Sequence, residues 1–196
     1  MNTIETRVGE QWDALKRTGV VREGHFVLAS GLHTGEVINA RAAEAWLMDE
    51  VFQDLGPYVL GVRPDAMVGV PHGADHFVEY IAPMLHVSSS YDHRVRPVKI
   101  DKGPDAMVVP EGAIRPGERV LVLEDVFTTG GSLEKACQAL VAVGAVIVGK
   151  FAIFNRSSRD GMAEEQGVQY SVRHAIADYE PAACPLCAEG IPLEEV

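Results

Sequence analysis

The stretch that decides the fold is residues 120–132, VLVLEDVFTTGGS. It opens with four apolar residues, continues with the consecutive acids Glu124 and Asp125, and ends in a turn of hydroxyl and glycine residues. A short apolar run followed by a turn is typical of a buried strand. The segment LEKACQALVAVGA that comes next has helical spacing and ends near Gly144. The sequence here predicts a strand, a tight turn and a helix in immediate succession.

The segments on either side repeat this arrangement. Residues 146–154, VIVGKFAIF, form a second apolar run, and residues 66–70, AMVGV, form another, which PHGAD connects to a helical pattern over 75–85. Strand, helix and strand in this order form a βαβ unit, whose strands are parallel and whose helices cover the sheet. We therefore expect an α/β fold with a parallel central sheet and helices on both faces.

The remaining chain completes one domain. Helical patterns run from Ile4 to Leu15 and over 41–55, and strand-like segments lie at 26–28, 87–90 and 95–100. Residues 101–118 are rich in glycine, proline and charge, so we expect a long mobile loop that adds nothing to the packed core. The length of 196 residues suits one domain over 1–196, with no internal repeat.

Composition restricts the partners. The formal net charge is -11, from 28 acidic and 17 basic residues, which opposes extended contact with nucleic acid phosphates. No apolar run approaches the roughly 20 residues that span a bilayer. The first residues, MNTIETRVGE, lack the apolar core of a signal peptide. We expect a soluble, cytoplasmic protein that binds neither nucleic acid nor membrane.

The residues after the central strand are suited to a sugar phosphate. Ligands of open α/β sheets bind at the carboxyl ends of the strands, where Glu124 and Asp125 emerge. Glycines let the backbone approach a phosphate, and the amides of 128–132 with the helix N-terminus form an anion site. The segment is neither a P-loop nor a GxGxxG fingerprint. An apolar strand that ends in acids also occurs in response-regulator domains, which do not need the TTGGS turn.

Residues 120–132 resemble the phosphoribosyl pyrophosphate (PRPP) motif of type I phosphoribosyltransferases. The wider sequence is most similar to the orotate phosphoribosyltransferase family. Residues 17–34, RTGVVREGHFVLASGLHT, resemble its amino-terminal segment, and GVPHGA at 69–74 resembles its pyrophosphate loop. Residues 179–193, YEPAACPLCAEGIPL, resemble the tail of some members. The resemblance implies a small hood, from about 1–40 and 176–196, beside the central sheet.

The resemblance also implies a reaction and the residues that carry it. Ribose 5-phosphate would pass from PRPP to a nitrogen base, with release of pyrophosphate. The resemblance implies orotate as this base and orotidine 5'-phosphate as the product. Glu124 and Asp125 would bind the ribose hydroxyls. Mg2+ is implied as a cofactor that the substrate itself mainly holds, with no metal ligand from the chain. The other PRPP-binding residues would be Pro71, His72 and Gly73 at the pyrophosphate, and Thr128, Thr129, Gly130, Gly131 and Ser132 at the 5-phosphate.

The long loop after Val98 resembles the family's catalytic loop, which often serves the neighbouring subunit of a dimer. Lys99 and Lys102 keep the expected spacing of two catalytic lysines, so a homodimer is implied. Val98 and Pro104 stand where the family has arginine and histidine. The nearby Arg94 and Arg96 are candidates to compensate for this loss.

For the base, the resemblance implies Thr128 and Arg156, whose guanidinium could pair with a carboxylate. The segment TGEVIN at 34–39 departs from the family, which has an aromatic pair there. Two further readings stay open: a phosphoribosyltransferase for another pyrimidine or a purine, and a non-catalytic PRPP-sensing regulator. The departures that leave the base undecided are Glu36, Val37 and Ile38, with Ala29 at a position that is often basic.

Cysteine and histidine give a weaker signal. Cys184 and Cys187 form a CPLC with the spacing of a zinc knuckle, but the chain has no second such pair. A structural zinc would need ligands from elsewhere in the chain or from another subunit. The histidines share no metal-ligand spacing with these cysteines, so we expect most to be surface or core residues: His25, His33, His72, His76, His86, His93 and His174.

Overall fold

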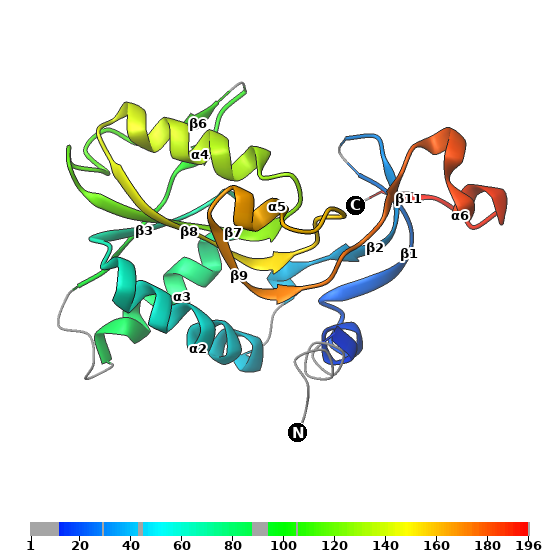
Figure 1. The fold of residues 1–196 in the computed structure, drawn as a ribbon, viewed down its shortest axis with the longest axis horizontal. Helices are drawn as coiled ribbons and strands as arrows, with labels where there is room; N and C mark the ends of the chain where they lie inside the picture. Colours follow the sequence, from blue (N-terminus) through cyan, green and yellow to red (C-terminus); the bar gives the residue numbers. More distant parts are fainter. Residues whose placement is uncertain (1–11, 29, 43–44, 88–93, 105, 196) are drawn as a thin grey trace.

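The computed structural model describes residues 12–28, 30–42, 45–87, 94–104 and 106–195. Its main sheet has five parallel strands in the order β4-β3-β7-β8-β9 (Figure 1). The predicted parallel α/β fold is confirmed. The strands are β3 (Ala66–Gly69), β4 (Arg96–Val98), β7 (Arg119–Phe127), β8 (Val146–Asn155) and β9 (Val168–Arg173).

Helices cover both faces of this sheet (Figure 1). Side chains alternate along a strand, and in β7 Leu121 and Leu123 belong to one hydrophobic cluster while Val120 and Val122 belong to another. A strand buried on both sides must be apolar throughout, which explains the run VLVL. The first cluster packs under α2 (Ala45–Val62) and α3 (Asp75–Val87), and the second under α4 (Gly131–Ala142) with the short α5 (Met162–Glu165) nearby.

Two predicted boundaries change in the structure. The helix expected over 41–55 runs from Ala45 to Val62 and contains Pro57. Proline inside a helix costs roughly 3 kcal/mol, but Leu55 and Val59 are fully buried on either side of it, and this burial favours continuation. The strand expected at 87–90 falls largely outside the described residues, and Val87 itself ends α3.

The segment 101–118 is more ordered than its composition predicts. It contains a small antiparallel pair, β5 (Asp101–Lys102) with β6 (Met107–Val108). Met107 and Ile114 are buried in the second hydrophobic cluster. The expectation that this segment adds nothing to the core is therefore wrong, because two apolar side chains fold back onto the face of the sheet that α4 covers.

A second sheet, which we call the hood, stands beside the main one (Figure 1). Its strand order is β10-β2-β1-β11, so both ends of the chain contribute to it. The predicted hood of N- and C-terminal segments is thus present. Its elements are β1 (Val21–Val27), β2 (His33–Ile38), β10 (Asp178–Tyr179), η2 (Pro181–Ala183), α6 (Pro185–Ala188) and β11 (Glu194–Glu195), and η1 (Ala40–Ala42) follows β2 toward the core.

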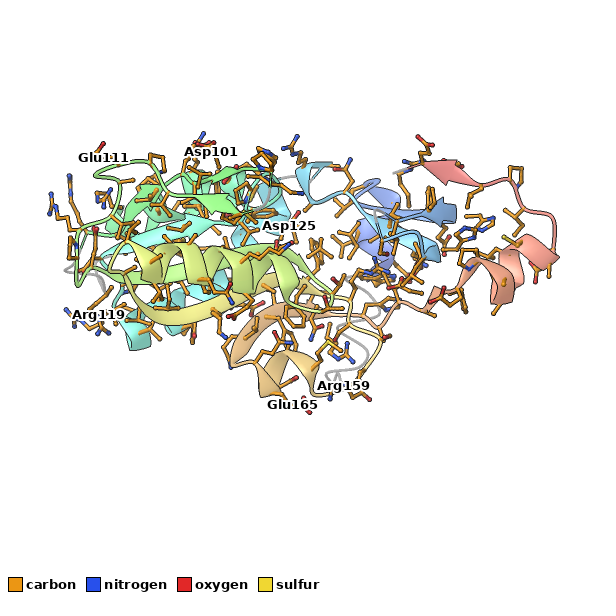
Figure 2. All side chains as sticks on the ribbon, turned by 90° about the horizontal axis from the view of Figure 1, so that it is seen from above. Asp101, Glu111, Arg119, Asp125, Arg159 and Glu165 are labelled. Carbon is orange, nitrogen blue, oxygen red and sulfur yellow. The ribbon has the colours of Figure 1, made fainter. Side chains whose placement is uncertain are left out.

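The strand order creates a switch point between β3 and β7. The chain leaves β3 toward β4 on one side and leaves β7 toward β8 on the other. A crevice opens at the carboxyl ends of two such strands, and this is where open α/β sheets bind ligands. Figure 2 shows Asp125 on the side of the core that faces the hood, and Arg119, at the start of the same strand, at the far end. Among the described helices, none is long and apolar enough to cross a membrane.

Candidate active site

Two loops meet at the switch point. Residues 69–74 follow β3, and the acids Glu124 and Asp125 lie near the end of β7. The amide of Val70 donates to the carbonyl of Leu123 over 2.8 Å, which holds the first loop beside the acids. The Pro71–His72 peptide bond in this loop is cis, although residue 72 is not a proline.

Gly73 is packed directly against the carboxyl group of Asp125. A Cβ at position 73 would overlap with Oδ1, Oδ2 and Cγ of Asp125. Gly69 is equally confined, since a Cβ there would stand 2.8 Å from the carbonyl carbon of Ala74. The loop approaches the acid pair this closely only because both positions are glycine.

The two loops enclose a cavity of about 670 Å3. Its wall joins the loop after β3, the end of β7, the turn and the first residues of α4. The predicted PRPP residues thus gather around one cavity, except that His72 is not among the residues of its wall. The lining is Ser30, Val70, Pro71, Gly73, Glu124, Asp125, Val126, Phe127, Thr128, Thr129, Gly130, Gly131, Ser132 and Lys135.

Glu124 is the more buried member of the acid pair. Glu124 is only 6% exposed. Burial, and then the nearby charge of Asp125, raise the pKa of Glu124 to about 9. At neutral pH Glu124 is therefore protonated in the free protein, and it can donate a hydrogen bond as well as accept one. A cation or a set of hydroxyl donors at this point would lower that pKa again.

The turn presents backbone donors to the cavity. Gly130 precedes α4 with a φ of 83°, and no side chain caps the helix there. The amides of the first turn of α4 are therefore available to an anion, and the helix dipole favours negative charge. Gln166 fixes the turn from outside by donating from Nε2 to the carbonyl of Thr129 over 3.0 Å.

Three residues at the site were not singled out from the sequence. Ser30, in the tip between β1 and β2, reaches the cavity from the hood. Lys135 lines it four residues after Gly131, a spacing that places both on one side of α4 and could have revealed it. Arg41 donates from Nε and Nη2 to the carbonyl of His72, over 3.2 and 2.7 Å, and so ties η1 to the loop over 69–74. No local pattern marks Arg41.

The two candidate lysines lie away from this cavity. Lys99 pairs with Glu79 of α3 over 2.6 Å, and Lys102 is exposed on β5. Neither belongs to the described residues that line the cavity. Arg94 precedes β4 and Arg96 is its first residue, so both lie at the amino ends of the strands. There they line a different cavity, of about 630 Å3, where Arg96 pairs with Glu118 over 2.7 Å.

Arg156, predicted to bind the base, connects the core to the hood. It is 5% exposed and pairs through Nη2 with Asp178 of β10, next to Thr34 at 3.4 Å. Its Nε is buried and has no hydrogen-bond partner among the described residues. Thr128, the other predicted base residue, lines the cavity, whereas Arg156 lies outside its described wall.

The departures in β2 have structural roles. Val37 is buried, and Ile38 packs against the first hydrophobic cluster. Glu36 accepts from Lys16 over 2.9 Å and lies 3.2 Å from His174. Burial raises the pKa of Glu36, but its neighbours, Lys16 and His174 among them, lower it by more than burial raises it. The pKa of Glu36 therefore lies below its ordinary value. Lys16 thus offsets part of the charge of Glu36, because it also pairs with Glu23 over 2.5 Å. Ala29 lies outside the described residues.

Two histidines and two cysteines that share no metal-ligand spacing in the sequence come together in the hood. His25 of β1 and His33 of β2 lie in a single cluster with Cys184 and Cys187. Sequence spacing did not reveal this, because the hood brings together residues from opposite ends of the chain.

Comparison with known proteins agrees with this geometry. Residues 36–182 match the model of the phosphoribosyl transferase domain. The orotate phosphoribosyltransferase of Thermus thermophilus is 33% identical over 92% of this chain and 96% of its own length. That of Thermotoga maritima is 32% identical over 93% and 95%. The crystal structure of orotate phosphoribosyltransferase from Aeropyrum pernix covers 82% of this chain and 92% of its own, with a TM-score of 0.62 and 23% identity.

Proposed function

The chain belongs to the orotate phosphoribosyltransferase family, and we propose that it transfers ribose 5-phosphate from PRPP to orotate with release of pyrophosphate. One observation carries this proposal. The acid pair, the glycine loop and the uncapped N-terminus of α4 converge on a single cavity at the switch point. A phosphorylated sugar with two further phosphates needs this combination of hydroxyl acceptors and backbone donors.

In the proposed reaction, a ring nitrogen of the base displaces pyrophosphate from the anomeric carbon of PRPP. Glu124 and Asp125 hold the ribose hydroxyls, and the amides of residues 128–132 hold the 5-phosphate. The backbone of residues 69–74 faces the pyrophosphate. No covalent nucleophile is needed, because the chain lowers the barrier by orienting the two substrates and by stabilising the departing charge.

The residues present fit a magnesium ion as the further cofactor. Asp125 and Glu124 offer hard oxygen atoms at the cavity, and the raised pKa of Glu124 reflects a buried acid pair that a cation would stabilise. Mg2+ would be held mainly by the substrate, beside these two carboxyl groups, and would neutralise the pyrophosphate.

A different base is the second candidate, and one observation favours it. Asp178 already pairs with the guanidinium of Arg156, so this cation is not free for a carboxylate on the base. Orotate would have to compete with Asp178, whereas a neutral pyrimidine or purine would not. The pairing of Glu36 with Lys16 argues the other way, because it offsets part of a negative charge that would repel orotate.

The proposal includes a homodimer in which the segment after β4 serves the neighbouring active site. Its support is the location of Lys99 and Lys102, which lie away from the described wall of the cavity in their own chain. Lysines from a second copy would supply the cations that the departing pyrophosphate requires. Mixing an Asp125→Asn chain with a Lys102→Ala chain should then restore part of the activity that each variant lacks alone.

The decisive experiment measures pyrophosphate release from PRPP and Mg2+ with orotate, uracil and adenine in turn. We expect turnover with orotate, and Asp125→Asn should lower it by roughly 10- to 1000-fold. PRPP with Mg2+ should also raise the melting temperature of the wild type. Turnover of a neutral base alone would support the transferase activity but would rule out orotate as its substrate. No melting shift at millimolar PRPP and no release with any base would refute the transferase itself.

A further inference from the structure

Four metal-ligating side chains converge inside the hood. They come from three elements: His25 from β1, His33 from β2, and Cys184 and Cys187 from the N-terminal flank and body of α6. One ligand atom of each lies within 4.8 Å of all the others. His25, His33 and Cys184 are buried, at 1%, 7% and 4% exposure. We propose that this cluster is a structural Zn2+ site that fastens the C-terminal tail to the β1–β2 hairpin.

The distances are those of a tetrahedral zinc site. Bonds of about 2.3 Å to sulfur and about 2.0 Å to nitrogen place two nitrogen ligands about 3.3 Å apart, and each nitrogen about 3.5 Å from a sulfur. His25 Nε2 lies 3.0 Å from His33 Nδ1, 3.5 Å from Cys184 Sγ and 3.6 Å from Cys187 Sγ. Cys187 Sγ lies 3.3 Å from His33 Nδ1. All four separations are within a few tenths of an ångström of that geometry.

Hydrogen bonding among the four groups does not explain this convergence. Nδ1 of His25 is 2.8 Å from the carbonyl oxygen of Ile191, which can only accept, so Nδ1 carries the proton. Nε2 of His25 then offers a single lone pair, yet three neighbouring atoms surround it. One lone pair accepts one hydrogen. A central cation instead accepts a lone pair from every member.

The second contact of His25 and the charge of the cluster also suit zinc. A ligating histidine usually donates its other ring nitrogen to a carbonyl or carboxylate, which fixes the tautomer, and Ile191 provides that carbonyl. Two thiolates neutralise a divalent cation, so the occupied site carries no net charge where it is buried. A tetrahedral pair of sulfurs and pair of nitrogens favours zinc over magnesium or calcium. Four protein ligands leave no open position, so the metal is structural.

This site is independent of the proposed reaction, and its test does not use activity. The full-length chain is produced with added zinc and purified under reducing conditions without chelator, and its metal content is measured by mass spectrometry. We expect about one zinc per chain in the wild type, and little in Cys184→Ser and Cys187→Ser. Cys137→Ala is the matched control, because Cys137 is the third cysteine and lies in α4, outside the cluster.

Cobalt titration keeps the test valid even if a variant fails to fold. Wild-type chain stripped of metal and supplied with Co2+ should show the visible absorption of tetrahedral cobalt with thiolate charge-transfer bands, and Zn2+ should displace it. Chelation should lower the melting temperature of the zinc-loaded wild type and of Cys137→Ala, because metal that binds only the folded state stabilises it. A wild type that retains no zinc and shows no cobalt bands would overturn the proposal. So would a Cys184–Cys187 disulfide as the main form of the reduced preparation.

Discussion

The α carbon of Gly73 lies so close to the carboxyl group of Asp125 that no other residue fits at position 73 without moving the acid. The loop over 69–74 and the side chain of Asp125 therefore compete for the same space. Gly73→Ala should displace the Asp125 side chain and lower turnover by roughly 10- to 1000-fold, with loss of the melting shift caused by PRPP. Steady-state kinetics and thermal melting check this.

The control for that substitution is Gly61→Ala in α2, where a Cβ meets no atom within 4 Å and the next residue is not a proline. Alanine is preferred to glycine in a helix by roughly 1 kcal/mol, so this variant should keep full activity and gain stability. Equal loss of activity in both variants would mean that the effect at position 73 is not local.

Glu124→Gln should change the stability of the protein in a way that depends on pH, while it lowers the activity. The pKa of Glu124 is raised to about 9 by burial and by Asp125, so its stabilising contribution is fully present below about pH 4.5 and is lost as pH rises toward 9. Glutamine stays neutral throughout. The variant should therefore gain stability over the wild type at a slope of up to about 1.4 kcal/mol per pH unit between pH 5 and 8.

Denaturant unfolding at several pH values measures that difference, while turnover of the same variant should fall. The ordinary outcome for a buried residue is a uniform loss of stability. A stability difference that does not change between pH 5 and 8 would show that Glu124 is already ionised in the free protein.

The pairing of Arg156 with Asp178 predicts a reciprocal effect on stability and base binding. Asp178→Asn removes the negative charge that balances a buried guanidinium and should cost about 1–3 kcal/mol of stability. If Arg156 binds an anionic base, orotate should then raise the melting temperature of Asp178→Asn more than that of the wild type.

Asp160→Asn is the matched control, because Asp160 is exposed and pairs with Arg173 at the surface. Its removal should cost less than about 1 kcal/mol and leave orotate binding unchanged. In addition, Arg156→Ala should weaken base use far more than PRPP binding. Parallel loss of both would assign Arg156 to the framework of the hood alone.

The Lys99–Glu79 ion pair allows a catalytic lysine to be distinguished from a surface one. Both side chains are more than half exposed, so the pair itself contributes little to stability. Lys99→Ala should lower turnover, whereas Glu79→Ala removes the same pair and should leave turnover unchanged or slightly raised. Matching losses in the two variants would reduce Lys99 to a partner of Glu79.

Sequence reasoning succeeded where structure is decided locally. The run VLVL, the acids and the TTGGS turn are contiguous, so β7, the turn and α4 could be predicted together with the cavity at their junction. The neighbouring loop over 69–74 follows a strand of the same kind, and parallel strands bring their carboxyl ends together. The site thus required one topological inference beyond local pattern.

What could not be predicted depends on distant partners. The pairing of Arg156 with Asp178 and the convergence of His25 with Cys184 both require the hood, whose strands have no signal that sets their register. The composition of residues 101–118 predicts a polar loop outside the core. The burial of Met107 and Ile114 instead depends on the surface that the sheet presents to them. Composition is a property of the segment itself, whereas the burial of its side chains depends on the residues that surround it in the fold.

The parallel pairing of β1 with β11 also sets an order of assembly. The main sheet needs only residues 66–173, whereas the hood needs Phe26 beside Glu194 and Arg22 joined to Glu194 across 172 residues. Contacts of such separation carry the largest loop-closure cost and form late in folding. During synthesis β1 can pair with β2 early, but its pairing with β11 must wait until nearly the whole chain has emerged, so the main sheet is complete before the hood is.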